Sequence, residues 1–311
     1  MRPSRPLSIA VVASQVAVAS SPISAATVAM TTVVEPMGIG YLQVLAVTIP
    51  TTFIGCAVGA IVASRQGKEL KDDPIYQERE AKGLVSHSAA AAAPDFKPAP
   101  SAIPSLLIFL ASLVVIVVWA ISSKQLGIMS NPPINSSSAI MVIMMTTAAI
   151  ICVLSRKPVS EVTTQSTFRA GMTAAICIMG VAWLGTTFFN NYMSQITTVG
   201  SSLLHQVPWF YAVILYFCAP LLFSHAATTA AFMPVAAKIG LTATTMLACY
   251  PAVANYYLLP NYPTTVAAIE MDDTGSTRVG RFVLNHPFVI PGTVSIAVAV
   301  ALGFFWAPIV A

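Results

Sequence analysis

A long apolar stretch near the C-terminal end, residues 241–270, is broken by prolines that stand beside small polar side chains. The stretch is long enough to cross a membrane, for which a helix needs about 20 residues, yet Pro251, Pro260 and Pro263 interrupt it. A broken helix in lipid frees backbone N–H and C=O groups, which must then find partners or line a cavity. Transporters use such unwound helices to bind their substrates. The stretch therefore predicts a transporter with its substrate site at a helix break.

Composition places the whole chain in the membrane. The 311 residues are 56% hydrophobic and only 8% charged, whereas soluble domains carry roughly a quarter charged residues. We therefore predict an all-α polytopic membrane protein. The net charge of +4 lies in short clusters between apolar runs, so nucleic acid is not an expected partner. The five cysteines lack metal-ligand spacing and no nucleotide-binding, metalloprotease or hydrolase motif occurs, so neither an enzyme nor a cofactor is predicted.

Most of the apolar segments fit one crossing each: 7–34, 41–64, 104–122, 138–155, 169–190, 208–239, 241–270 and 287–311. Segment 208–239 is too long for one crossing and too short for two full ones, and its centre is polar. We expect a re-entrant helical hairpin with its tip at Ser224–Thr229, although two full crossings also fit. Residues 65–103 form the one long polar stretch and predict a flexible connection, helical near Asp73–Lys82.

The positions of Lys and Arg predict the orientation, because these residues accumulate on the cytoplasmic side. If segment 208–239 is re-entrant, 13 of the 15 basic residues fall on one side. Two full crossings would give the same result, whereas a single crossing would not. We therefore expect a cytoplasmic N-terminus, a cytoplasmic linker at 65–103 and a C-terminus on the opposite side.

Two broken spans run in opposite directions in this arrangement. The first is interrupted at Ala19–Ala25 and the second at Leu259–Thr265, an antiparallel relation that inverted repeats produce. The N–H groups that begin each second half-helix suit a carboxylate. We expect polar side chains to face one another across a midplane site: Ser20, Ser21 and Ser24 opposite Asn261, Thr264 and Thr265. The alternative is a pair of proline kinks whose hydroxyls bond to their own helices.

The predicted hairpin tip contributes an ionisable residue at membrane depth. His225 lies between Ser224 and Thr228, and ionisable groups inside membranes often serve function. It could donate to a substrate carboxylate or carry a coupled proton. A neutral histidine bonded to a neighbouring carbonyl is the alternative. Together, Ser224, His225 and Thr228 join the candidate substrate-binding residues.

The chain resembles the anaerobic C4-dicarboxylate transporter family, the Dcu type A/B group. The resemblance rests on Ser-Ser-Pro-Ile-Ser at 20–24, Leu-Pro-Asn-Tyr-Pro-Thr-Thr-Val-Ala-Ala-Ile at 259–269 and Gly-Arg-Phe-Val-Leu-Asn-His at 280–286. It implies a bacterial inner-membrane carrier that exchanges fumarate, succinate, malate and aspartate by antiport. It also implies two inverted repeats, each with a hairpin and a broken helix, and a homodimer. The partners are then the dicarboxylates and the lipid bilayer.

The family pattern also includes an N-terminal region with several spans and the first hairpin, which we expect this chain to lack. Residues 1–64 would then be the end of the first repeat, 65–103 the cytoplasmic linker and 104–311 the second repeat. That repeat would hold scaffold spans, the hairpin at 208–239, the broken helix at 241–270 and the last span at 287–311. The alternatives are a truncated, non-transporting regulatory or degenerate membrane protein, or a carrier of another organic anion.

Overall fold

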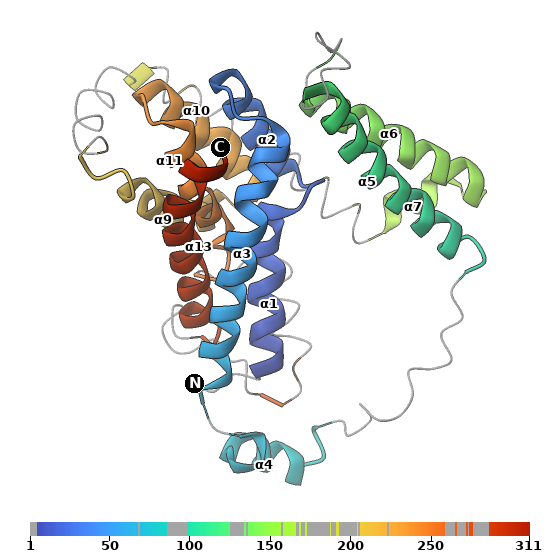
Figure 1. The fold of residues 1–311 in the computed structure, drawn as a ribbon. Coiled ribbons are helices and arrows are strands. Elements are labelled where there is room, and N and C mark those ends of the chain that lie inside the picture. Colours follow the sequence, from blue (N-terminus) through green and yellow to red (C-terminus); the bar gives the residue numbers. More distant parts are fainter. Residues whose placement is uncertain are drawn as a thin grey trace.

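The computed structural model describes a set of helices from the N-terminal half and the C-terminal end of the chain (Figure 1). The described residues are 5–67, 69–85, 99–124, 134, 136–156, 158–165, 168, 172, 187, 191–192, 204, 206–222, 224–258, 265, 272, 274–275 and 286–311. Their α-helices are α1 (Arg5–Ala17), α2 (Ala25–Val34), α3 (Tyr41–Ser64), α4 (Pro74–Ala81), α5 (Ala102–Lys124), α6 (Ser136–Ser155), α7 (Val159–Thr164), α9 (Phe210–Leu222), α10 (His225–Ile239), α11 (Ala243–Cys249) and α13 (Val289–Val310). Two 3₁₀ turns matter for the site: η1 (Val18–Ser20) and η5 (Tyr250–Ala254).

Five helical segments in this described part are long and apolar enough to cross a membrane. They are Leu7–Met37, Tyr41–Ser64, Ala102–Trp119, Ser138–Ser155 and Val289–Val310. Each coincides with a span predicted from the sequence, so the polytopic, all-helical class is confirmed for the described residues. The predicted span at 169–190 lies almost wholly outside them.

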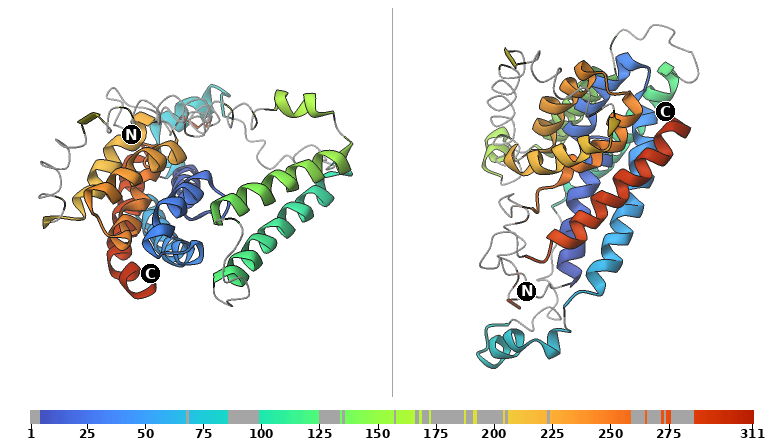
Figure 2. Two further views of the ribbon diagram at one scale, coloured as in Figure 1. Left: turned by 90° about the horizontal axis from the view of Figure 1, so that it is seen from above. Right: turned by 90° about the vertical axis from the view of Figure 1, so that its left-hand side faces the viewer.

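Helices α3 and α13 run antiparallel and form the centre of the bundle (Figure 2). Gly55 and Gly59 of α3 lie directly against Ser295 of α13, where an added Cβ would meet Ser295 atoms. At the other end of the pair, the Gln43 side chain donates to the Val310 carbonyl at 3.5 Å. Small residues let membrane helices approach closely, which favours association where water supplies no driving force. The glycines of α3 therefore set the tightest helix contact of the bundle.

A proline inside α3 is compensated by a side chain from α13. Pro50 has no N–H and cannot donate to the carbonyl four residues earlier, that of Ala46. The indole Nε1 of Trp306 donates to this carbonyl at 3.0 Å. Backbone groups freed in a membrane helix need such a partner. The bond from Trp306 therefore replaces the backbone bond that Pro50 cannot make to the Ala46 carbonyl.

The segment predicted as a hairpin forms two short helices, α9 and α10, which pack against each other. They have 13 and 15 residues, or roughly 20 and 22 Å at the α-helical rise. Ser224 begins α10 because its side chain accepts a hydrogen bond from the Ala227 N–H at 3.2 Å. Pro220 lies inside α9, and the carbonyl four residues before it, that of Tyr216, accepts from Asn255 Nδ2 at 2.6 Å.

Helices α5 and α6 form a pair beside the main bundle (Figures 1 and 2). Ile116 of α5 and Ile140 of α6 pack on Tyr41 and Leu45 of α3 in a small apolar cluster of their own. Many of the remaining large apolar side chains of α5 and α6 are exposed, as expected for helices that face lipid. This pair also packs on the first broken span, through Ile23 and Val28 of that cluster and the contact of α6 with α2.

The polar linker holds a helix at the predicted place. Asp73 caps α4 by accepting from the Ile75 N–H at 3.0 Å, so the local helix prediction is confirmed. Arg79 of α4 lies beside Gly275, where an added Cβ would sit 2.7 Å from the Arg79 Cδ. The linker therefore contacts the loop that follows the second broken span.

Candidate functional site

The first span breaks where its sequence predicts. Helix α1 ends at Ala17, a 3₁₀ turn follows, and the backbone at Ser21 and Ser24 is extended before α2 begins. Ser24 caps α2, with its Oγ accepting from the Thr27 N–H at 3.0 Å and lying 2.9 Å from Thr27 Oγ1. The freed carbonyl of Pro22 accepts from the Tyr41 hydroxyl at 2.7 Å. The break is thus stabilised by hydrogen bonds at both of its ends.

The predicted serines of this break behave differently from one another. Ser20 Oγ donates to the Ala17 carbonyl at 3.1 Å, so it bonds back to its own helix as the alternative interpretation held. Ser21 is half-buried and follows the turn with an extended backbone. Ser24 alone stands at a helix N-terminus, which makes it the strongest of the three candidates.

The hairpin tip meets the end of α1. His225 is buried, and its Nε2 lies 3.1 Å from the Gln15 carbonyl. Carbonyls in the last turn of a helix lack intrahelical partners, and a carbonyl oxygen only accepts. Nε2 therefore carries the proton, and His225 ties α10 to the first break. Its bond to a carbonyl matches the alternative offered for this histidine, and a substrate role for it remains a prediction.

The second broken span leaves its helix at the first of its three predicted prolines. Helix α11 ends at Cys249 and a 3₁₀ turn begins at Tyr250, while the break predicted at 259–265 lies, apart from Thr265, outside the described residues. Pro251 ends the helix because it has no N–H and its ring clashes with the preceding turn. Asn261 and Thr264 lie outside the described residues. Thr265 is buried, and its hydroxyl has no hydrogen-bond partner among the residues that the structure describes.

Tyrosines of the second broken span reach the hydroxyls of α10 and of the first break. The Tyr256 hydroxyl lies 3.0 Å from Thr228 Oγ1, and the Tyr256 ring packs on His225 with ring centroids 4.3 Å apart. The Tyr250 hydroxyl faces the side chains of Thr27, Thr229 and Ser24. Turn η5 also contacts turn η1, while α10 packs along α2. Tyr250 and Tyr256 therefore bring the turn after α11 together with the first break and the start of α10.

The chemistry of this meeting point suits an anion. Its side chains are hydroxyls, and the N-termini of α2 and α10, capped by Ser24 and Ser224, both contribute to it. A helix N-terminus carries roughly half a positive charge and exposes unpaired N–H donors. Sequence reasoning missed Thr27, Thr229 and Tyr250 as members of this site. Two local signals were available: Thr27 lies three residues after the cap Ser24, and Tyr250 directly precedes Pro251.

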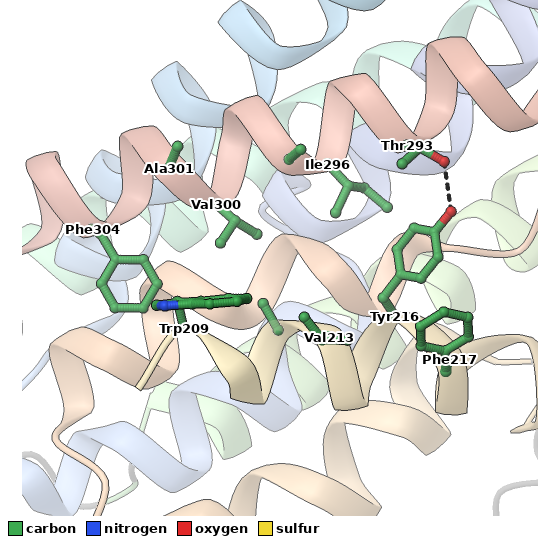
Figure 3. A pocket seen from close by; sticks show the side chains of 11 residues that line it. Trp209, Val213, Tyr216, Phe217, Thr293, Ile296, Val300, Ala301 and Phe304 are labelled. Atoms are coloured by element: carbon green, nitrogen blue, oxygen red, sulfur yellow. Dashed lines mark hydrogen bonds between the residues drawn. The ribbon is translucent and has the colours of Figure 1, made fainter. Parts of the chain in front are cut away.

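A second concavity, between α9 and α13, has the opposite character (Figure 3). This groove of about 440 Å³ is lined by apolar side chains such as Trp209, Phe217, Val300 and Phe304. Its one polar pair, Tyr216 and Thr293, is joined by a hydrogen bond of 2.6 Å. An almost wholly apolar lining does not suit a dianion, so the candidate substrate site is the hydroxyl-lined meeting point of the broken helices.

Comparisons with known proteins agree with this geometry. The profile of the family described as anaerobic C4-dicarboxylate membrane transporter matches residues 1–311. The C4-dicarboxylate transporter DcuA of Wolinella succinogenes is 46% identical over 310 residues, which cover 99% of this chain and 71% of that protein. DcuA of Escherichia coli K12 is 42% identical over 98% of this chain and 70% of its own length. The anaerobic C4-dicarboxylate transporter DcuB of Escherichia coli O6:H1 is 31% identical over 99% of this chain and 71% of its length.

A search of solved structures gives no significant match. The expectation that this chain lacks the family's N-terminal region finds no support in the family profile, which matches residues 1–311. These relatives are named transporters, which confirms the prediction of a transporter over an enzyme. The chain belongs to the anaerobic C4-dicarboxylate membrane transporter family.

Proposed function

We propose that this protein is a secondary transporter that exchanges C4-dicarboxylates, such as fumarate, succinate, malate and aspartate, across the bacterial inner membrane by antiport. The observation that carries the proposal is the meeting of two helix N-termini, those of α2 and α10, at a buried set of hydroxyls. A small dianion needs donors for two carboxylates in a site that water does not reach. The positive ends of two helix dipoles attract such a group without a buried cation. The printed names of the relatives give the substrate class.

The substrate-binding set that we propose joins the two breaks and the hairpin tip. Ser24 and Ser224 cap the N-termini of α2 and α10. Thr228 lies within hydrogen-bond distance of the Tyr256 hydroxyl, and His225 bonds to the Gln15 carbonyl. Ser20 and Ser21 lie on the approach to it. Thr265 belongs to the set because its buried hydroxyl has no partner among the described residues, and Asn261 and Thr264 are retained on the sequence argument.

The proposed architecture is an inverted-repeat transporter with a re-entrant hairpin. Helices α9 and α10 measure roughly 20 and 22 Å, less than the hydrocarbon core of about 30 Å. This supports a hairpin that enters the membrane and returns. Arg79 of the linker lies beside Gly275, so the linker and the loop after the second broken span lie on the same side of the membrane. This agrees with the orientation proposed from the basic residues, with a cytoplasmic N-terminus and linker and a periplasmic C-terminus. A homodimer, as the family resemblance implies, is part of the proposal.

Counterflow in proteoliposomes tests the function. Vesicles that contain the purified protein and unlabelled succinate inside should take up external labelled succinate, whereas vesicles loaded with buffer alone should not. Excess fumarate or aspartate should compete, and citrate should compete poorly. Strong competition by citrate with weak competition by fumarate would indicate a carrier of another organic anion.

The absence of counterflow with every dicarboxylate would contradict the proposal, provided that circular dichroism shows the protein to be folded. Such a result would favour the non-transporting alternative, a regulatory or degenerate membrane protein. Empty liposomes, and liposomes with heat-denatured protein, control for leakage of label.

A further inference from the structure

Tyr250 is a fully buried tyrosine whose hydroxyl has no hydrogen-bond partner among the described residues. Its exposed fraction is 0%, and although the hydroxyls of Thr27, Thr229 and Ser24 lie near its oxygen, none of them stands in hydrogen-bonding geometry to it. A buried hydroxyl left unpaired costs about 1–3 kcal/mol, and the cost is higher where lipid excludes water. Such a group is expected to gain a partner in another state of the protein.

The surroundings of Tyr250 indicate what that partner is. The hydroxyl faces Thr27 and Ser24, at the N-terminus of α2, and Thr229, in the first turns of α10. Both N-termini attract negative charge and repel cations. The unpaired hydroxyl and the two helix ends are independent observations, and both favour an anionic ligand.

The hydrogen bonds of the neighbouring threonines show which hydroxyl can donate. Thr229 Oγ1 donates to the His225 carbonyl at 2.8 Å, and Thr27 Oγ1 donates to the Ala19 carbonyl at 3.5 Å. Their protons are therefore used within the protein. The Tyr250 proton is not used by any described residue, so Tyr250 is a donor that a carboxylate would find at this point.

We propose that the Tyr250 hydroxyl donates a hydrogen bond to one carboxylate of the transported dianion, at an anion site that the N-termini of α2 and α10 share. This inference rests on the proposed function and adds Tyr250 as a specificity-determining residue. The ring of Tyr250 also packs in the core of the bundle, which holds the hydroxyl in place without a protein hydrogen bond.

The chain provides a matched control in Tyr257. It is also fully buried, and its hydroxyl also has no partner among the described residues. Its ring, however, lies against Gly292 of α13, and its neighbours include Tyr216 and Cys56 rather than the two helix N-termini. A Tyr257→Phe variant therefore removes the same atom from a buried site that lies away from the proposed ligand.

The experiment compares Tyr250→Phe with Tyr257→Phe in the full chain, using succinate counterflow in proteoliposomes. Loss of a hydrogen bond to a charged group corresponds to a factor of about 10 to 100. Tyr250→Phe should therefore raise the KM for succinate by about 10-fold or more, with a smaller change in the maximal rate. Tyr257→Phe should keep the KM within about twofold of the wild type, because a substitution away from the ligand leaves binding nearly unchanged.

Each outcome separates the inference from the proposed function. Absence of counterflow in the wild-type protein contradicts the proposed function itself. Wild-type counterflow with an unchanged KM in Tyr250→Phe, or an equal rise in Tyr257→Phe, overturns the role of Tyr250 alone. If Tyr250→Phe does not fold, a fluorinated tyrosine at position 250 keeps the size and the hydroxyl, and its more acidic phenol donates more strongly. The KM should then fall, and an unchanged KM would overturn the inference.

Discussion

Replacing Trp306 by Phe tests whether α13 compensates the proline of α3. The indole donates to the Ala46 carbonyl at 3.0 Å, the carbonyl that Pro50 leaves without its usual N–H partner. Hydrogen bonds between membrane helices contribute about 0.6 kcal/mol on average and up to about 1.7 kcal/mol. An unpaired buried carbonyl costs about 1–3 kcal/mol. We therefore expect Trp306→Phe to lower the free energy of unfolding by about 1–2 kcal/mol.

A double-mutant cycle separates this hydrogen bond from the smaller volume of Phe. In a Pro50→Ala background, residue 50 regains an N–H that can bond to the Ala46 carbonyl within α3. Trp306→Phe should then cost only its lost packing, so the coupling energy between positions 50 and 306 should be about 1 kcal/mol. Equilibrium unfolding in mixed micelles, with helix content as the readout, measures all four proteins.

Trp209→Phe serves as the control, because Trp209 is 56% exposed and its substitution should stay within about 0.5 kcal/mol of the wild type. The reasoning is refuted if Trp306→Phe costs the same in the wild-type and Pro50→Ala backgrounds. Equal costs would mean that only the packing of the indole matters. The Ala46 carbonyl would then be satisfied in some other way.

Two further predictions concern packing and pH. Gly59→Ala should lower the free energy of unfolding by about 1–3 kcal/mol. The new Cβ would meet the Ser295 side chain and lie 2.8 Å from the Pro291 carbonyl. Thermal melts should show no such loss for the control Ala57→Val, which lies on the exposed face of α3. Burial lowers the pKa of His286, while bonds to the Leu258 and Tyr257 carbonyls partly oppose this shift. Since the folded-state pKa lies below the unfolded value of about 6.5, the free energy of unfolding should be constant above that pH and fall below it. His286→Phe should flatten the decline, and an unchanged slope would rule out His286 as its source.

Local signals in the sequence predicted much of the fold. Span lengths, caps and prolines act within a few residues, so the five described spans, the break at Ala19–Ala25 and the cap of α4 at Asp73 followed from the sequence. The start of α10 followed from the polar residues around Ser224, which caps this helix. Each of these features depends on groups adjacent in the chain.

Contacts between distant residues could not be predicted in the same way. His225 bonds to the carbonyl of Gln15, 210 positions away, and Trp306 to that of Ala46, 260 positions away. No local pattern selects such partners, because they depend on how the helices pack. The second break shows the same limit: its prolines were recognised and Pro251 ends α11 locally, but the contact of Tyr256 with Thr228, 28 positions away, was not foreseen.

The two kinds of proline break in this protein differ in how completely their polar groups are satisfied. The carbonyls that Pro50 and Pro220 free are bonded by Trp306 and Asn255, as stability in lipid demands. The second broken span, in contrast, leaves four buried polar atoms without a partner among the described residues: the hydroxyls of Tyr250, Tyr257 and Thr265, and Oδ1 of Asn255. At about 1–3 kcal/mol each, these groups would be selected against if the break served packing alone. Of these four, the Tyr250 hydroxyl lies beside the helix N-termini, and its missing partner is explained if a ligand supplies it during each transport cycle.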